Sequence, residues 1–411
     1  MKSHFHAATF PSFACALVLC ASVRATDLLV DPTGAPGTFA TIQAALVAAQ
    51  PGDRILVQPG VYPSFSVTKS ITILGMGSSV DAVVVAGIHL GLGFPNQHYH
   101  VSISRLRVAP GPLAPLAVSG QELGVGQIEF ESVQIDGGFR LLSGEPGFVL
   151  SLANCSVVGT VGQGFDGATC HVASPAPSTF SITRCQFQGA PGDLFVAQPP
   201  LAGLLLDRGV TAQIAQCVIR GGNGGLAQAG APGLDVRQAQ VRSLGTMSTI
   251  RGGDGGAGAC GGPGVLTTST VFYGSATVTG GPGSPNGPVA AGTGTLLPST
   301  GTDPELQVAV NQTMSGPVLV GSGTHLAWHL ASAGAPALVL VSPAIGNPLP
   351  PPLDQLLIDP ASSILMATTL DLVLPSFGAF VGLPLFGQGV SLDVAHNTLL
   401  ATAPFALHLD H

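Results

Sequence analysis

Three stretches decide the fold: RCQFQG (184–189), QCVIRG (216–221) and MSTIRG (247–252). In each, a small residue, an apolar residue and a glycine occupy every second position: Cys185, Phe187 and Gly189; Cys217, Ile219 and Gly221; Ser248, Ile250 and Gly252. Side chains of a strand alternate between its two faces, so this period of two predicts a short strand with one buried face. The glycine predicts a sharp turn after it, with positive φ where the turn needs it.

The pattern recurs along the chain. Eight copies begin at Ile71, Leu106, Val133, Cys155, Cys185, Cys217, Ser248 and Ala276, with separations from 22 to 35 residues. Such separations are typical of structural repeats, and neither a helical period of 3.6 nor a leucine-dense frame accompanies them. We therefore expect a coil of strands in which each turn lies about 4.8 Å from the last. In this coil the three cysteine starts form an apolar ladder.

Residues 38–77, TFATIQAALVAAQPGDRILVQPGVYPSFSVTKSITILGMG, resemble the opening turn of the right-handed parallel β-helix, or pectin-lyase-like, superfamily. The resemblance rests on an amphipathic helix over 41–49, a Pro-Gly-Asp turn over 51–53, an I-x-V-x-P-G-x-Y motif and Lys69. It implies an all-β fold, with an N-terminal capping helix and a right-handed parallel β-helix over 26–295. The superfamily contains lyases, hydrolases, esterases, adhesins and surface proteins, so the resemblance does not define an activity.

The remaining segment, 296–411, contains short apolar runs separated by turn residues. These runs predict a small β-rich, sandwich-like domain. The segment also resembles the C-terminal β-modules of secreted bacterial surface proteins.

The composition restricts partners and location. Charged residues make up 8 % of the chain, the net charge is −8 and no basic run is present, so we exclude nucleic acid as a partner. Residues 1–25 read as a signal peptide with an apolar centre over 13–23 and cleavage after Ala25; a lipoprotein signal at Cys20 is the alternative. We expect a secreted or cell-surface protein with no transmembrane segment after cleavage.

Five cysteines remain in the mature chain, in an oxidising compartment: Cys155, Cys170, Cys185, Cys217 and Cys260. An odd number leaves at least one of them unpaired within a monomer. The sequence leaves their pairing open.

The nearest resemblance to an enzyme family is to pectin methylesterases, over 184–195 and 216–225. The position of that family's catalytic aspartate falls on Gly224, and the position of its oxyanion-hole glutamine falls on Pro191 or Gly192. The nucleophilic carboxylate that such an esterase needs is therefore missing. A polysaccharide lyase with an arginine base is the stronger enzymatic alternative.

One pair of turns offers a candidate ligand site. Arg220 and Arg251 follow the buried residue of successive turns, and Asn223 and Asp254 lie three positions further on. Two guanidinium groups about 5 Å apart repel unless a carboxylate, from Asp254 or an anionic sugar, lies beside them. We hypothesise that these four residues contact acidic polysaccharide. The alternative is a solvated edge in which Asn223 and Asp254 serve turn geometry.

No cofactor is expected. The glycine-rich runs resemble calcium-binding repeats, but they hold one Asn223 and one Asp254 instead of an aspartate in every nonapeptide, so Ca²⁺ is the weaker alternative. His98 and His100, and likewise His325 and His329, share strand faces without an evident third metal ligand.

These observations predict an exported protein with a structural or binding role, in contact with acidic polysaccharide or a cell-envelope component. The alternative is a carbohydrate-active enzyme, foremost a polysaccharide lyase. Carboxylates converging on adjacent turns would favour the enzyme, and a flat flank of short side chains would favour the binding role.

Overall fold

The computed structural model describes residues 26–411, except 92–98, 112–115, 125, 145–147, 162–166, 176–177, 194–197, 245–247, 274–275, 299–304, 311–318, 321–324, 332–336, 343–363, 367–368, 374–383, 394–397, 402–404 and 410–411. The predicted signal peptide and His98 lie outside the described residues.

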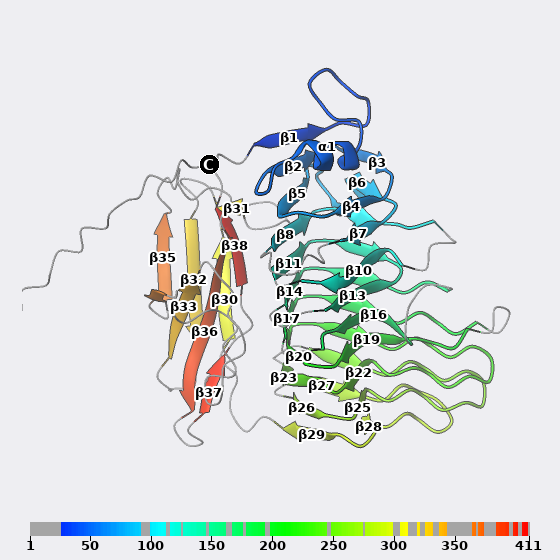
Figure 1. The fold of residues 1–411 in the computed structure, drawn as a ribbon. Helices are drawn as coiled ribbons and strands as arrows, with labels where there is room; N and C mark the ends of the chain where they lie inside the picture. The colour runs from blue at the N-terminus through cyan, green and yellow to red at the C-terminus, as the bar shows by residue number, and fades with distance from the viewer. Residues whose placement is uncertain are drawn as a thin grey trace, which may run out of the picture.

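Three parallel sheets form the body of the molecule. From β2 to β26 each strand pairs with the strand three positions further along the chain, and β1 pairs with β2. Sheet A contains β1 (Asp27–Val30), β2 (Arg54–Val57), β5 (Ile71–Gly75), β8 (Tyr99–Ser104), β11 (Gly126–Glu131), β14 (Phe148–Ala153), β17 (Ser178–Thr183), β20 (Val210–Ala215), β23 (Gln240–Leu244), β26 (Thr270–Tyr273) and β29 (Thr295–Pro298). Sheet B contains β3 (Gly60–Tyr62), β6 (Val83–Val85), β9 (Arg107–Val108), β12 (Gln134–Asp136), β15 (Ser156–Val158), β18 (Gln186–Gln188), β21 (Val218–Arg220), β24 (Thr249–Arg251) and β27 (Thr277–Thr279). Sheet C contains β4 (Phe65–Val67), β7 (Ile88–Leu90), β10 (Val118–Leu123), β13 (Phe139–Ser143), β16 (Ala168–Ala173), β19 (Ala202–Asp207), β22 (Leu234–Arg237), β25 (Val265–Thr267) and β28 (Ala290–Ala291). The expected right-handed parallel β-helix is confirmed (Figure 1).

The first turn is capped by a helix, as the sequence predicts. Helix α1 (Ile42–Ala48) begins after Thr41, whose hydroxyl accepts a hydrogen bond from the Ala44 N–H at 3.1 Å. At the other end, the Lys69 ammonium donates to the Ala49 carbonyl at 2.7 Å, which places a cation where the helix dipole is negative. The helix covers the open end of the hydrophobic column with its buried face.

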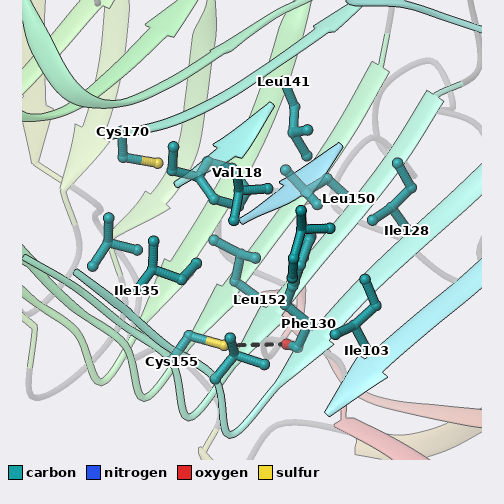
Figure 2. Close-up of a cluster of buried hydrophobic side chains, with 14 of the residues drawn as sticks. Ile103, Val118, Ile128, Phe130, Ile135, Leu141, Leu150, Leu152, Cys155 and Cys170 are labelled. Atoms are coloured by element: carbon teal, nitrogen blue, oxygen red, sulfur yellow. Dashed lines mark hydrogen bonds between the residues drawn. The ribbon is translucent and has the colours of Figure 1, made fainter. Parts of the chain in front are cut away.

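Equivalent side chains stack in columns inside the coil. The inward column of sheet B is almost fully buried and consists of Tyr62, Val85, Val108, Ile135, Val157, Phe187, Ile219 and Ile250. Figure 2 shows buried side chains of the three sheets meeting in the centre. Phe130 of sheet A packs edge-on against Phe139 of sheet C, with ring centroids 5.5 Å apart. No single turn can bury its inner face alone, so stability is shared along the stack.

The expected cysteine ladder is present at the entrance to sheet B. The backbone N–H groups of Cys155 and Cys185 each donate to the sulfur one turn further on, of Cys185 and Cys217 respectively, at 3.4 Å. All five cysteines are free thiols, four of them buried and Cys260 exposed. Burial raises the pKa of the Cys170 and Cys185 thiols, which keeps them protonated and unreactive.

The repeat copy that begins at Ile71 does not stack in the same column as the other seven copies. The Ile71 copy is strand β5 of sheet A, whereas the copies from Leu106 onward enter sheet B. The first turns of sheet B are β3 and β6. The error arises because strands of both sheets alternate with a period of two, so periodicity alone does not tell the sheets apart.

The C-terminal segment forms two further, mostly antiparallel sheets, which agree with the expected sandwich-like domain. One contains β30 (Glu305–Val310), β32 (His325–Ala331) and β35 (Thr369–Val373). The other contains β31 (Leu319–Val320), β33 (Ala337–Ser342), β34 (Ile364–Met366), β36 (Pro384–Asp393), β37 (Thr398–Ala401) and β38 (Phe405–Leu409). Among the described residues, no helix is both long and apolar enough to span a membrane.

In the view of Figure 1 the C-terminal strands are drawn on the same side of the coil as sheet A. The outward side chains of sheet A are polar and yet buried, including Ser102, Glu129, Ser181 and Gln213. Sheet A is therefore a covered face, and the outward faces of sheets B and C are the flanks where a ligand site is to be sought.

Candidate functional site

Arg220 and Arg251 end two neighbouring strands of sheet B. They pair in register across β21 and β24, so their Cα atoms lie about 4.8 Å apart. The preceding residues, Ile219 and Ile250, are fully buried, and the alternation directs both arginines outward. Arg220 is exposed, and the side chain of Arg251 is 35 % exposed.

The other two predicted site residues join this pair. Arg251 donates from Nη2 to Oδ1 of Asp254 at 2.6 Å. The Asp254 N–H in turn donates to the side-chain oxygen of Asn223 on the preceding turn at 3.0 Å. The structure therefore brings all four residues together. Among the described residues it shows no carboxylate paired with Arg220, so two guanidinium groups and one carboxylate leave a local charge of +1.

Next to the arginines, stacked loops project from the coil (Figure 1). We call the loops 221–233, 252–264 and 280–289 the glycine fin. Their outgoing legs bond to the returning leg of the preceding turn: Gly222 N–H to the Leu201 carbonyl, Gly253 to Ala231 and Gly281 to Gly262, each at 2.8 Å. Returning legs donate back to outgoing legs of the same loop, as in the bond from the Gly262 N–H to the Gly253 carbonyl at 2.8 Å. The fin is therefore a network of backbone hydrogen bonds.

The fin requires glycines because the backbones of neighbouring legs leave no room for a Cβ atom. A Cβ atom added to Gly222 would lie 1.9 Å from the Ala190 carbonyl oxygen, and one on Gly253 would lie 1.9 Å from that of Gly222. Neither glycine has a positive φ. Of the glycines that close the repeat copies, Gly137 alone has one, at 140°. Most of these glycines therefore turn without a positive φ, and they are required because their legs pack too closely for any side chain.

Close backbone packing also accounts for the glycine runs that resemble calcium-binding repeats. Within the described part of the chain, no three His, Cys, Asp or Glu side chains gather into a cluster suited to a metal ion. His100 lies on sheet A with Nε2 3.6 Å from Glu129 Oε1. His325 and His329 lie in β32.

Sequence reasoning missed a second polar column, on the outward face of sheet C. His89, Ser119, Arg140 and His171 pair in register on four successive turns. The His89 Nδ1 atom lies 2.7 Å from the Ser119 hydroxyl oxygen. No local motif marks these residues, which are 21 to 31 positions apart. The available signal was the single polar residue between two apolar ones, as in Ile88-His89-Leu90.

Comparison with known proteins adds little. No protein-family profile and no curated protein matches the chain. A solved structure that matches is a mutant of a PL6 family alginate lyase, with 17 % sequence identity and a TM-score of 0.33. The match covers 60 % of this chain and 44 % of that one, so the chain spans less than half of the length of the lyase.

Proposed function

We propose that the protein is an exported, secreted or cell-surface binding protein that holds acidic polysaccharide on the outward face of sheet B. The observation that carries the proposal is the in-register pair Arg220 and Arg251, which has one carboxylate partner for two guanidinium groups. A guanidinium group binds a carboxylate or sulfate group through two parallel hydrogen bonds. The net positive charge stands out on a chain whose own net charge is −8.

The surroundings of the pair suit an extended polymer. The outward rows of sheet B near the arginines consist of short or unbranched side chains: Ser156, Val158, Gln186, Gln188, Val218, Thr249, Thr277 and Thr279. Beyond these rows the surface continues over the glycine fin, whose glycines carry no side chains that would project from it. A polysaccharide can lie across successive turns on such a surface, with its anionic groups directed to the arginines.

The geometry favours binding over the enzymatic alternative. A lyase of this fold needs a base together with acidic ligands for a cation that neutralises the sugar carboxylate. On this flank the Asp254 carboxylate is engaged by Arg251 at 2.6 Å and held next to Asn223 through its backbone. Asp254 is the one carboxylate that the described residues place in contact with the arginine pair, and it is already engaged by Arg251.

Affinity electrophoresis in gels that contain polygalacturonate tests the proposal. The variant Arg220→Gln/Arg251→Gln removes both guanidinium groups. Arg208→Gln is the matched control, because Arg208 is 65 % exposed and pairs weakly with Asp207 at 3.5 Å, away from sheet B. Two exposed contacts of about 0.5–1 kcal/mol each predict roughly 5- to 30-fold weaker binding for the double variant.

The control variant should bind like the wild type, and none of the proteins should be retained by neutral dextran. Equal retention of the double variant and the wild type would refute the proposal. The same mixtures, followed for the ultraviolet absorbance of unsaturated uronate products, test the lyase alternative. Product formation that depends on the protein would establish it in place of binding alone.

A further inference from the structure

The outward column of sheet C places a serine between a histidine and an arginine. His89 on β7, Ser119 on β10 and Arg140 on β13 are direct register partners, so adjacent Cα atoms are about 4.8 Å apart. Their neighbours Ile88, Val118 and Phe139 are buried in the core, which fixes the strands and directs the polar side chains outward.

The serine and the histidine are in hydrogen-bond contact. The Ser119 hydroxyl oxygen and the His89 Nδ1 atom lie 2.7 Å apart, within reach for direct proton transfer. A serine hydroxyl is a weak nucleophile until an adjacent base accepts its proton. His89 is exposed and Ser119 partly exposed, so a solute can reach both. In the tautomer with the proton on Nε2, Nδ1 accepts the hydrogen bond from the hydroxyl.

Arg140 continues the row on the next turn, as the register partner of Ser119 on the side opposite His89. Its side chain makes a contact of its own within the fold. The reactive arrangement is therefore the pair formed by Ser119 as nucleophile and His89 as base.

We propose that His89 and Ser119 form an acyl-transfer site that hydrolyses small esters, such as acetyl groups carried on a larger molecule. Ser119 Oγ forms a bond to the acyl carbon, its proton passes to His89 Nδ1, and the ester C–O bond breaks as the leaving alkoxide takes up that proton. Water then attacks the acyl-serine, giving its proton to His89, and the acid is released as Ser119 regains a proton. Because His89 is exposed, the site lies open to solvent. An acyl group on a larger molecule can reach such a site when the acyl group is short.

The chain provides its own control serine. Ser66 on β4 is the register partner of His89 on the other side, and it is exposed. The hydrogen bond of His89 Nδ1 goes to Ser119. If accessibility alone governed reactivity, Ser66 would react at least as readily as the less exposed Ser119. If the base governs it, Ser119 reacts first.

The experiment is labelling of the full chain with a fluorophosphonate probe, followed by peptide mass spectrometry, together with hydrolysis of p-nitrophenyl acetate. We expect the label on Ser119, its loss in Ser119→Ala and its retention in Ser66→Ala. His89→Gln should lower both labelling and hydrolysis by about 10²-fold or more, because general-base catalysis contributes about 10²- to 10⁴-fold.

Two results would overturn the proposal. One is the absence of labelling in the wild type. The other is equal labelling of Ser66 and Ser119 with hydrolysis unchanged in Ser119→Ala, which would reduce the contact to a hydrogen bond between turns. The site lies on sheet C, away from the arginine pair of sheet B, so either result leaves the proposed polysaccharide binding untouched.

Discussion

Replacing one fin glycine by alanine should loosen a whole turn of the fin. In Gly253→Ala the new Cβ would lie 1.9 Å from the Gly222 carbonyl oxygen and 2.5 Å from its carbon, whereas carbon atoms pack at about 3.5–4.0 Å. The legs must separate, which breaks the bonds from Gly253 to Ala231 and from Gly262 to Gly253, both 2.8 Å long.

The magnitude follows from three contributions. Two backbone hydrogen bonds are worth about 1–3 kcal/mol together, and overpacking adds about 1–3 kcal/mol. The stiffer unfolded chain returns about 0.4–1 kcal/mol. We therefore expect the free energy of unfolding to fall by about 3 kcal/mol, if the fin unfolds with the coil. If the fin opens locally, the same loss appears as faster hydrogen exchange over 252–264.

Urea unfolding and hydrogen exchange of the two glycine variants provide the assay. The matched control is Gly111→Ala, because a Cβ at Gly111 meets no atom within 4 Å and its φ is not positive. The control should be stabilised slightly, by about 0.4–1 kcal/mol. A Gly253→Ala protein that is as stable as the wild type, with unchanged exchange over 252–264, would refute the claim that the legs of the fin pack too closely for a side chain.

Three further predictions concern charge, pH and export. Asp254→Asn raises the local charge at the arginine pair from +1 to +2, so it should bind polygalacturonate up to about fivefold more tightly, and weaker binding in affinity electrophoresis would contradict this. Burial raises the pKa of Tyr62 to about 12 and that of the Cys185 thiol well above its usual value. Both groups are held neutral in the fold, so their contribution to stability is present below about pH 8.5. This contribution is lost as the pH rises through the pKa values of the folded state. Urea midpoints that do not fall between pH 8 and 11 would refute this prediction. Finally, mass spectrometry of the protein from its native host should give Thr26 as the first residue, and an intact N-terminus would contradict export by the predicted signal.

Much of the fold could be predicted because the coil repeats a simple physical rule. Each inward position must be apolar to match its neighbours above and below, so Phe187, Ile219 and Ile250 reveal their column directly in the sequence. The cap was predictable from Thr41 and the amphipathic run after it, since an N-cap hydroxyl has a recognisable position. The same alternation occurs in all three sheets, so it does not show that the Ile71 copy belongs to sheet A and the other copies to sheet B.

The candidate sites differ in how far sequence reasoning could find them. Arg220 and Arg251 occupy the same offset after a buried isoleucine, so alignment of the repeats was enough to bring them together. His89 and Ser119 contact each other across 30 residues. Loops between sheets vary in length, so the sequence separation between turns is irregular and hides such partners. The role of the fin glycines was also hidden, because the sequence does not show that the legs of neighbouring loops interleave.

The most direct test of polysaccharide binding on sheet B is a hydrogen-exchange footprint with and without an oligogalacturonate. Protection should appear in the peptides that hold Arg220 and Arg251, over 216–225 and 247–256, and should be absent from the peptides of sheet C around Ser119. Saturating oligogalacturonate that leaves exchange unchanged over 216–225 and 247–256, or that protects another face instead, would contradict the account.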